Sequence, residues 1–160
     1  MTWTTPATFT SLQNVSPSDL NAQIRDNSRA LSQWTSYTPT WTGTGGTPTV
    51  GNGILTGRYR LFGNVCHVRI DLLWGSTTSA AGITVWRFAL PSGVTAAGLN
   101  VLSARAYDSS ANVDYSCTGF ASVGAGTAGV TSSATGNVGI SNPFAWATSD
   151  RLTIQGQIEC

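Results

Sequence analysis

Few side chains in this sequence could carry out acid–base or nucleophilic chemistry. His67 is the single imidazole, and of the seven acidic residues only Glu159 is a glutamate. General acid–base catalysis needs a titratable group held beside a partner. His67 has no second histidine and no carboxylate cluster near it in the sequence, so the pattern predicts a surface or subunit-interface position rather than a catalytic or metal-binding one.

The cysteines and aspartates do not complete a catalytic arrangement either. Cys66, Cys117 and Cys160 are far apart and show no C-x-x-C spacing. We expect Cys66 and Cys117 on the apolar side of strands, where a thiol stays protonated and inert. Asp108 and Asp114 could in principle form a sugar-hydrolysing pair, but acidic residues are scarce. The sequence predicts a protein that is not an enzyme and that has no metal site and no cofactor.

The composition favours one core with an uncharged polar surface. The chain has 160 residues, of which 41% are hydrophobic and only 9% charged, far below the usual quarter. Threonine, serine, asparagine and glycine must therefore keep the surface hydrated, which suits a particle exposed outside a cell. With a net charge of +1 and no basic stripe, we expect no nucleic-acid partner. No apolar run is long enough to span a bilayer, so no membrane insertion is expected.

A helix is predicted in the N-terminal region 1–34. Ser16 can cap it, Pro17 suits its first position, and Asp19 completes a capping box. The apolar positions then follow the spacing of a coiled-coil seam, with a polar residue in the middle: Leu20, Ile24, Asn27, Leu31 and Trp34.

Two interpretations of this stripe remain open. The stripe could pack on the β-domain of the same chain, with Asn27 hydrogen-bonded to a loop. Alternatively, identical helices could form a parallel bundle in which a buried asparagine fixes the register. The second interpretation makes the helix an oligomerising element, although two heptads alone are too short to be stable in water.

The rest of the sequence predicts a mainly β fold. Residues 35–53 are rich in threonine, glycine and proline and are expected to form a linker. From residue 54 to 160, short alternating runs indicate strands, the clearest being Val65–Trp74, whose even positions are apolar. We predict an antiparallel β-sandwich, jelly-roll-like, preceded by the short helix.

Small residues dominate the segment from Gly124 to Asn137. This segment is interpreted either as a mobile surface loop or as a strand packed closely against a symmetry mate, where only small side chains fit. The sequence does not decide between the two.

Aromatic residues exceed the need of one small core. Trp74 and Trp86 fall on inward positions of predicted strands, whereas Trp3, Phe9 and Trp41 lie in the region expected outside the sandwich. We therefore predict Trp3, Phe9 and Trp41 as candidate residues for docking a neighbouring subunit or another protein.

Several motifs resemble the small virion surface and minor tail proteins of phages of actinobacteria and related hosts. The resemblance covers the chain from about residue 16 to the end and is carried by Leu20-Asn-Ala-Gln-Ile-Arg-Asp-Asn27, Tyr37-Thr-Pro-Thr-Trp-Thr42, Gly51-Asn-Gly-Ile-Leu-Thr-Gly-Arg-Tyr59, Val68-Arg-Ile70, Trp74-Gly-Ser-Thr-Thr78 and Pro143-Phe-Ala-Trp-Ala-Thr-Ser-Asp-Arg-Leu152. It implies a homotrimeric virion protein, made in the bacterial host cytoplasm, with a helix for assembly and a β-domain presented outward.

The expected function is structural, with a contribution to host attachment through glycans of the cell envelope. The main alternative is a capsid decoration protein that binds the lattice of the major capsid protein. A glycan-cleaving depolymerase is a third, less favoured alternative because carboxylates are scarce. Other virion proteins, in the tail or the capsid, are the expected partners besides the chain itself.

Overall fold

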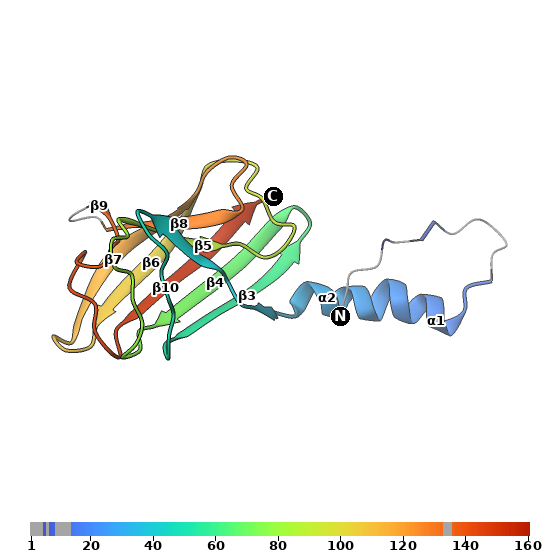
Figure 1. The fold of residues 1–160 in the computed structure, drawn as a ribbon. Coiled ribbons are helices and arrows are strands. Elements are labelled where there is room, and N and C mark those ends of the chain that lie inside the picture. The colour runs from blue at the N-terminus through green and yellow to red at the C-terminus, as the bar shows by residue number, and fades with distance from the viewer. Residues whose placement is uncertain (1–4, 6, 9–13, 133–135) are drawn as a thin grey trace.

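In the described part of this protein a helix is followed by one antiparallel sheet, as a computed structural model shows (Figure 1). The structure describes residues 5, 7–8, 14–132 and 136–160, without the side chains of residues 30–32. The prediction of a mainly β, antiparallel fold is confirmed.

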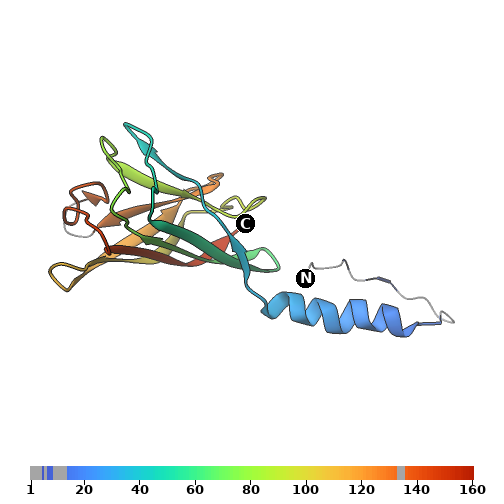
Figure 2. The ribbon, with the colours of Figure 1, turned by 60° about the horizontal axis from the view of Figure 1, so that its bottom comes forward.

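The helix begins where the capping residues predict. Ser16 and Asp19 form a reciprocal capping box: the backbone N–H of Asp19 donates to Ser16 Oγ at 3.2 Å, and that of Ser16 donates to Asp19 Oδ2 at 3.1 Å. The helix then runs through α1 (Pro17–Leu20), a π-helical segment η1 (Asn21–Asp26) and α2 (Asn27–Ser32). It stands away from the sheet, as two views show (Figures 1 and 2).

All named strands join in a single sheet. In sequence they are β1 (Thr35–Tyr37), β2 (Trp41–Thr44), β3 (Ile54–Phe62), β4 (Val65–Leu73), β5 (Val85–Ala89), β6 (Asn100–Asp108), β7 (Val113–Ala121), β8 (Thr127–Ser132), β9 (Gly136–Asn137) and β10 (Arg151–Glu159). Their order across the sheet is β1-β3-β4-β10-β6-β7-β8-β5-β2, with β9 beside β8. Every pairing between them is antiparallel.

The sheet curls so that its two edges approach each other. The edge strands β1 and β2 are consecutive in the chain and are separated only by Thr38, Pro39 and Thr40. Two hydrogen bonds link β1 and this connection to β5: the Tyr37 hydroxyl donates to the Ala89 carbonyl at 3.3 Å, and the Ala89 N–H donates to the Thr40 carbonyl at 2.8 Å. The described strands therefore form one curled sheet, and the predicted division into the two sheets of a sandwich is not seen.

Strand alternation gives the sheet an apolar inner face, as the sequence predicts. In β4, Cys66, Val68, Ile70 and Leu72 are each at most 1% exposed, and Arg69 between them is exposed. β10 follows the same rule with Leu152, Ile154 and Ile158. The core lies inside the curl.

Residues 35–53, predicted as a linker, belong partly to the sheet. They contain β1 and β2, and Pro39, Trp41 and Pro48 are buried. The prediction failed because threonine- and glycine-rich composition is typical of connections, whereas here short edge strands use the same residues.

The small-residue segment 124–137 contains the strands β8 and β9, and its residues 133–135 lie outside the described part of the structure. β8 lies between β7 and β5 of the same chain, so residues 127–132 form a strand and not a mobile loop, and close packing of this strand against a symmetry mate stays a prediction. Small residues are needed there because a Cβ at Gly129 would lie 2.5 Å from the ring of Phe120 on β7.

A buried carboxylate fixes the loop that precedes β10. Asp150 is 1% exposed and accepts hydrogen bonds from the backbone N–H groups of Ser109 at 2.8 Å and Ala147 at 2.6 Å. Its two oxygens thus tie this loop to the end of β6.

Asp150→Ala should lower the free energy of unfolding by about 2–3 kcal/mol, because it leaves two N–H groups without their acceptor. Urea denaturation measures this change. Asp114→Ala is the control: its ion pair with Arg105 is exposed, so its removal should cost less than about 1 kcal/mol. Equal losses in the two variants would contradict the structural role of Asp150.

Candidate functional site

The predicted helix seam is partly exposed in the single chain. Leu20 and Ile24 are 47% and 62% exposed. The side chain of Leu31 lies outside the described part of the structure. Of the two interpretations, packing of Leu20 and Ile24 on the β-domain is therefore wrong, and these two apolar side chains are free to meet another surface.

Asn27 departs from the predicted seam. It is only 3% exposed although no second chain is present. The neighbouring Gln23, one helical turn earlier, accepts a hydrogen bond from the backbone N–H of Ala7 at 3.0 Å, so part of the N-terminal arm lies along this side of the helix. Asn27 is thus covered within its own chain and does not share the exposed position of Leu20 and Ile24.

Trp34 does not belong to the helix. The helix ends at Ser32, and Gln33 has an extended backbone, with φ −90° and ψ 133°. The Trp34 ring instead lies beside the guanidinium groups of Arg58 and Arg60, at 5.9 Å and 5.4 Å from its centre. It contributes a half-exposed aromatic surface where the helix meets β3, and its inclusion in the seam is corrected.

Of the three candidate docking residues, the structure describes one, Trp41. Trp41 is 5% exposed and packs in the core at 4.9 Å from the Trp86 ring and 5.9 Å from that of Trp74. Its prediction as an outward docking residue is therefore wrong. Trp3 and Phe9 lie outside the described residues, so their role stays a prediction.

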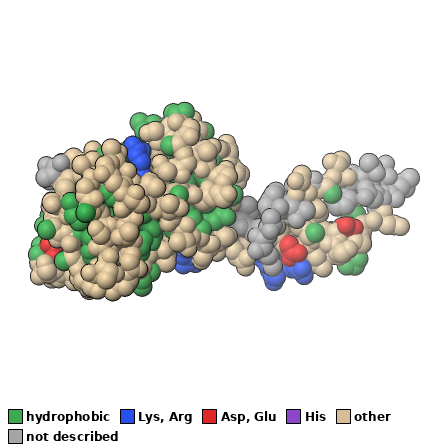
Figure 3. Space-filling model, viewed as in Figure 1, with side chains coloured by type: hydrophobic (Ala, Val, Ile, Leu, Met, Phe, Trp, Pro, Cys, Tyr) green, Lys and Arg blue, Asp and Glu red, His purple; other side chains and the backbone are tan. Residues whose placement is uncertain are grey.

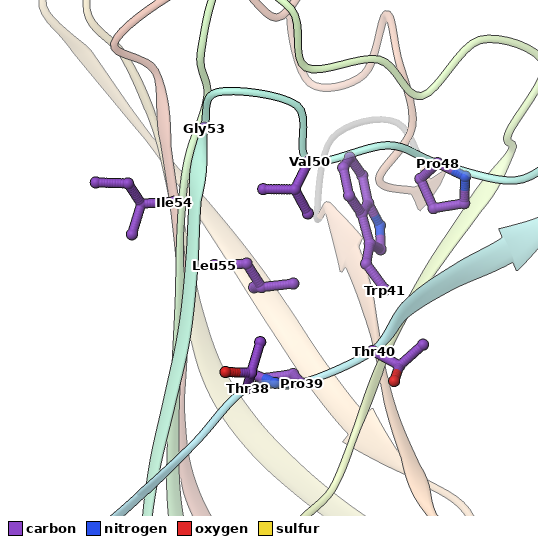
Figure 4. A pocket seen from close by; sticks show the side chains of 9 residues that line it. All are labelled: Thr38, Pro39, Thr40, Trp41, Pro48, Val50, Gly53, Ile54 and Leu55. Carbon is purple, nitrogen blue, oxygen red and sulfur yellow. The ribbon is translucent and has the colours of Figure 1, made fainter.

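An apolar hollow borders Trp41. It has a volume of about 530 Å³ and lies between the β1–β2 connection and the start of β3 (Figure 4). Val50, Leu55 and Pro39 are among its walls, with the hydroxyl of Thr38 as one of its few polar groups. Among the described residues, no charged side chain lines it. The hollow can therefore contact an apolar group of a ligand but cannot carry out acid–base chemistry.

The outer face of the sheet collects most of the positive charge. Ladder pairing places six of the eight arginines on this one face. Five of them lie together on β3, β4, β6 and β10, namely Arg58, Arg60, Arg69, Arg105 and Arg151, and Arg87 lies farther around the curl on β5. Only Asp71, Asp114 and Glu159 are acidic there. Much of the remaining surface is uncharged (Figure 3).

Several exposed apolar side chains lie at the end of the outer face nearest the helix. Phe62, Leu99 and Val101 are 58%, 71% and 69% exposed. Phe62 of β3 lies opposite Val65 of β4, and Val65 lies opposite Glu159 of β10, the strand next to β6. Exposed apolar side chains therefore gather at this end of the outer face next to the charged Arg60 and Glu159, and the ion pairs Arg69–Asp71 and Arg105–Asp114 lie farther from the helix.

Cys66 and His67 do not form a nucleophile–base pair. As consecutive residues of β4 they point to opposite faces of the sheet. Cys66 has no exposed surface, and burial, with a smaller effect of Cys160, raises the pKa of its thiol to about 12. The thiol is therefore protonated at neutral pH.

Asp108 and Asp114 are not arranged as a hydrolytic pair. Asp114 lies opposite Tyr107 and Asp108 opposite Val113, so strand alternation directs the two carboxylates to opposite faces. Hydrogen bonds from the Ala111 backbone and the Ser110 hydroxyl lower the pKa of Asp108. A general acid would need a raised pKa.

The described residues show neither a metal site nor a membrane-spanning helix. They contain no group of three or more His, Cys, Asp or Glu side chains placed to hold a metal ion. None of their helices combines the length and apolarity needed to cross a membrane.

Comparison with protein families, with curated proteins and with solved structures finds no match to this chain. The resemblance to phage virion proteins therefore stays a prediction.

The burial of Cys66 predicts a low thiol reactivity. In the folded protein at pH 8, Cys66 should react with a soluble aromatic disulfide reagent at least about 100-fold more slowly than Cys160, which is partly exposed, because its sulfur is enclosed and protonated. Peptide mass spectrometry after timed labelling measures both rates, and unfolding in urea should remove the difference. Equal rates in the folded protein would contradict the buried position.

Proposed function

We propose that this chain is a non-enzymatic structural protein that assembles into a homotrimer through its helix and displays its β-domain on the outside of a bacteriophage particle. The observation that carries the proposal is the helix itself, which stands off the sheet with Leu20 and Ile24 exposed on it.

A helix in this position needs a partner. Isolated helices of a few turns are only marginally stable in water, and this one contains a π-helical segment, a form that is rare in proteins. Burial of a leucine or isoleucine side chain contributes about 1.5–3 kcal/mol. A bundle of identical helices supplies that burial in every copy. Because Asn27 is already covered, the contact centres on Leu20 and Ile24.

The exposed apolar side chains at the end of the outer face nearest the helix support the same assembly. Phe62 ends β3, and Leu99 and Val101 flank the first residue of β6; the helix departs from this end of the sheet (Figure 1). Contacts between β-domains can therefore continue those between helices.

The β-domain suits display on a particle. We propose that its curled sheet is jelly-roll-like. The β2-β5-β8 side would face the β3-β4-β10 side across the core that contains Trp41, Trp74 and Trp86. The low fraction of charged residues makes its hydration depend little on salt and pH. With the sequence resemblance, this supports a virion protein whose β-domain contributes to host attachment through envelope glycans.

Ile24→Asp should dissociate the trimer. The wild-type chain is expected at about three times its mass of 16.7 kDa in light scattering, and the variant at the mass of one chain at micromolar concentration. Asn21→Asp is the matched control, since it adds the same charge at an exposed polar position of the same helix. The β-domain should melt at an unchanged temperature in both variants. A trimer that persists in Ile24→Asp would contradict assembly through the helix.

Copy number on purified particles tests the attachment role. Quantitative mass spectrometry against the major capsid protein should give a few to a few dozen copies, as expected for a tail appendage. Hundreds of copies would contradict attachment and would instead indicate capsid decoration.

A further inference from the structure

A hollow of about 350 Å³ lies on the outer face, in the half far from the helix. Its walls come from β3, β4, β6 and β10, so each lining side chain projects from a hydrogen-bonded strand rather than from a loop. Sites carried on strands hold their groups in a defined geometry. The hollow differs from the one beside Trp41 because charged and hydroxyl groups line it.

Most charges in this hollow are paired within the chain. Arg69 donates two hydrogen bonds to Asp71, at 2.7 and 3.0 Å, and the Thr153 hydroxyl donates a third at 2.8 Å. Arg105 is paired with Asp114. Within each of these two ion pairs the positive and negative charges cancel.

Arg151 is the exception. It is exposed at the start of β10, lines the hollow, and has no ion-pair partner among the described residues. Its neighbours across the ladder are Leu73 and Tyr107, neither of which carries a negative charge. The hollow thus presents one uncompensated guanidinium, which is suited to a carboxylate or phosphate by paired N–H···O bonds.

The remaining lining fits a sugar. Ile54 is 55% exposed, and with Leu73 and Tyr107 it offers apolar surface to the C–H groups of a sugar ring. Asp71 and Thr153 can exchange hydrogen bonds with ring hydroxyls. Nucleic acid is disfavoured, because proteins bind its phosphate backbone with many unpaired cationic side chains. Among the described residues that line this hollow, Arg151 is the one such side chain.

We infer that this hollow binds one anionic sugar unit, with Arg151 holding its carboxylate or phosphate and with Asp71 and Thr153 contacting its hydroxyls. The inference rests on the proposed attachment role and specifies the chemistry of the glycan. One such contact is weak, and a trimer that presents three of them gains avidity.

Heteronuclear NMR titration of the full-length chain tests the site with three probes: trigalacturonic acid, glucose 6-phosphate and neutral maltotriose. At low salt the carboxylate or the phosphate probe should shift resonances of β4, β6 and β10, and maltotriose should bind at least about tenfold more weakly. Arg151→Gln should weaken the anionic probe about tenfold, as expected for loss of one charge-assisted contact. Arg87→Gln on β5 is the matched control and should bind like the wild type, because Arg87 lies outside the hollow.

The outcomes separate this site from the proposed assembly. A response to trigalacturonic acid alone identifies a carboxylated sugar, and a response to glucose 6-phosphate alone identifies a phosphorylated one; both support the site. Equal binding by wild type and Arg151→Gln, equal binding of maltotriose, or no binding of any probe overturns it. Ile24→Asp should retain the NMR response, since a failure of assembly leaves each hollow intact.

Discussion

The connection Thr38–Thr40 imposes the constraint on which the rest of the structure depends. It joins strands that lie at opposite edges of the sheet, so the sheet must curl until those edges meet. The aromatic core stabilises this curl. Trp41 on β2 contacts Trp86 on β5, and Trp86 in turn lies 5.7 Å from Trp74, which follows β4, and 4.9 Å from Trp146. Rings from distant parts of the sheet thus meet in one cluster, where large side chains contribute the most apolar burial.

Curling also explains where glycine is required. Tyr37 can pack over β3 because Gly57 has no side chain; a Cβ there would collide with the Tyr37 ring. That position lets the Tyr37 hydroxyl reach Ala89 on β5. At Gly63, in the turn between β3 and β4, the backbone has φ +61°, a conformation that glycine adopts without strain. The outward residues of β3 and β4 then align across the ladder, including Arg58 with Arg69.

Local patterns allowed several features to be predicted from the sequence. The capping box, the inward parity of β4 and β10, and the burial of Cys66 and Cys117 depend on residues close in the chain. The features that were missed depend on strand order. Trp41 is buried because β2 pairs with β5, whose sequence lies far away, and the arginines share a face only because β3, β4, β10 and β6 are neighbours. The end of the helix before Trp34 was also missed, because the apolar spacing continues through a residue that lies beside Arg58 and Arg60 instead.

The two faces of the sheet bear different constraints. The inner face must fill the curl, so a change there alters packing throughout the core. The outer face carries no such demand, so the ion pairs Arg69–Asp71 and Arg105–Asp114 lie at the surface, and Arg151 has no ion-pair partner among the residues that the structure describes. An exposed guanidinium keeps its hydration and costs the fold little. A ligand that replaces this water with two directed hydrogen bonds gains more from Arg151 than from an arginine already bound to a carboxylate, and this difference distinguishes Arg151 from Arg69 and Arg105 on the same face.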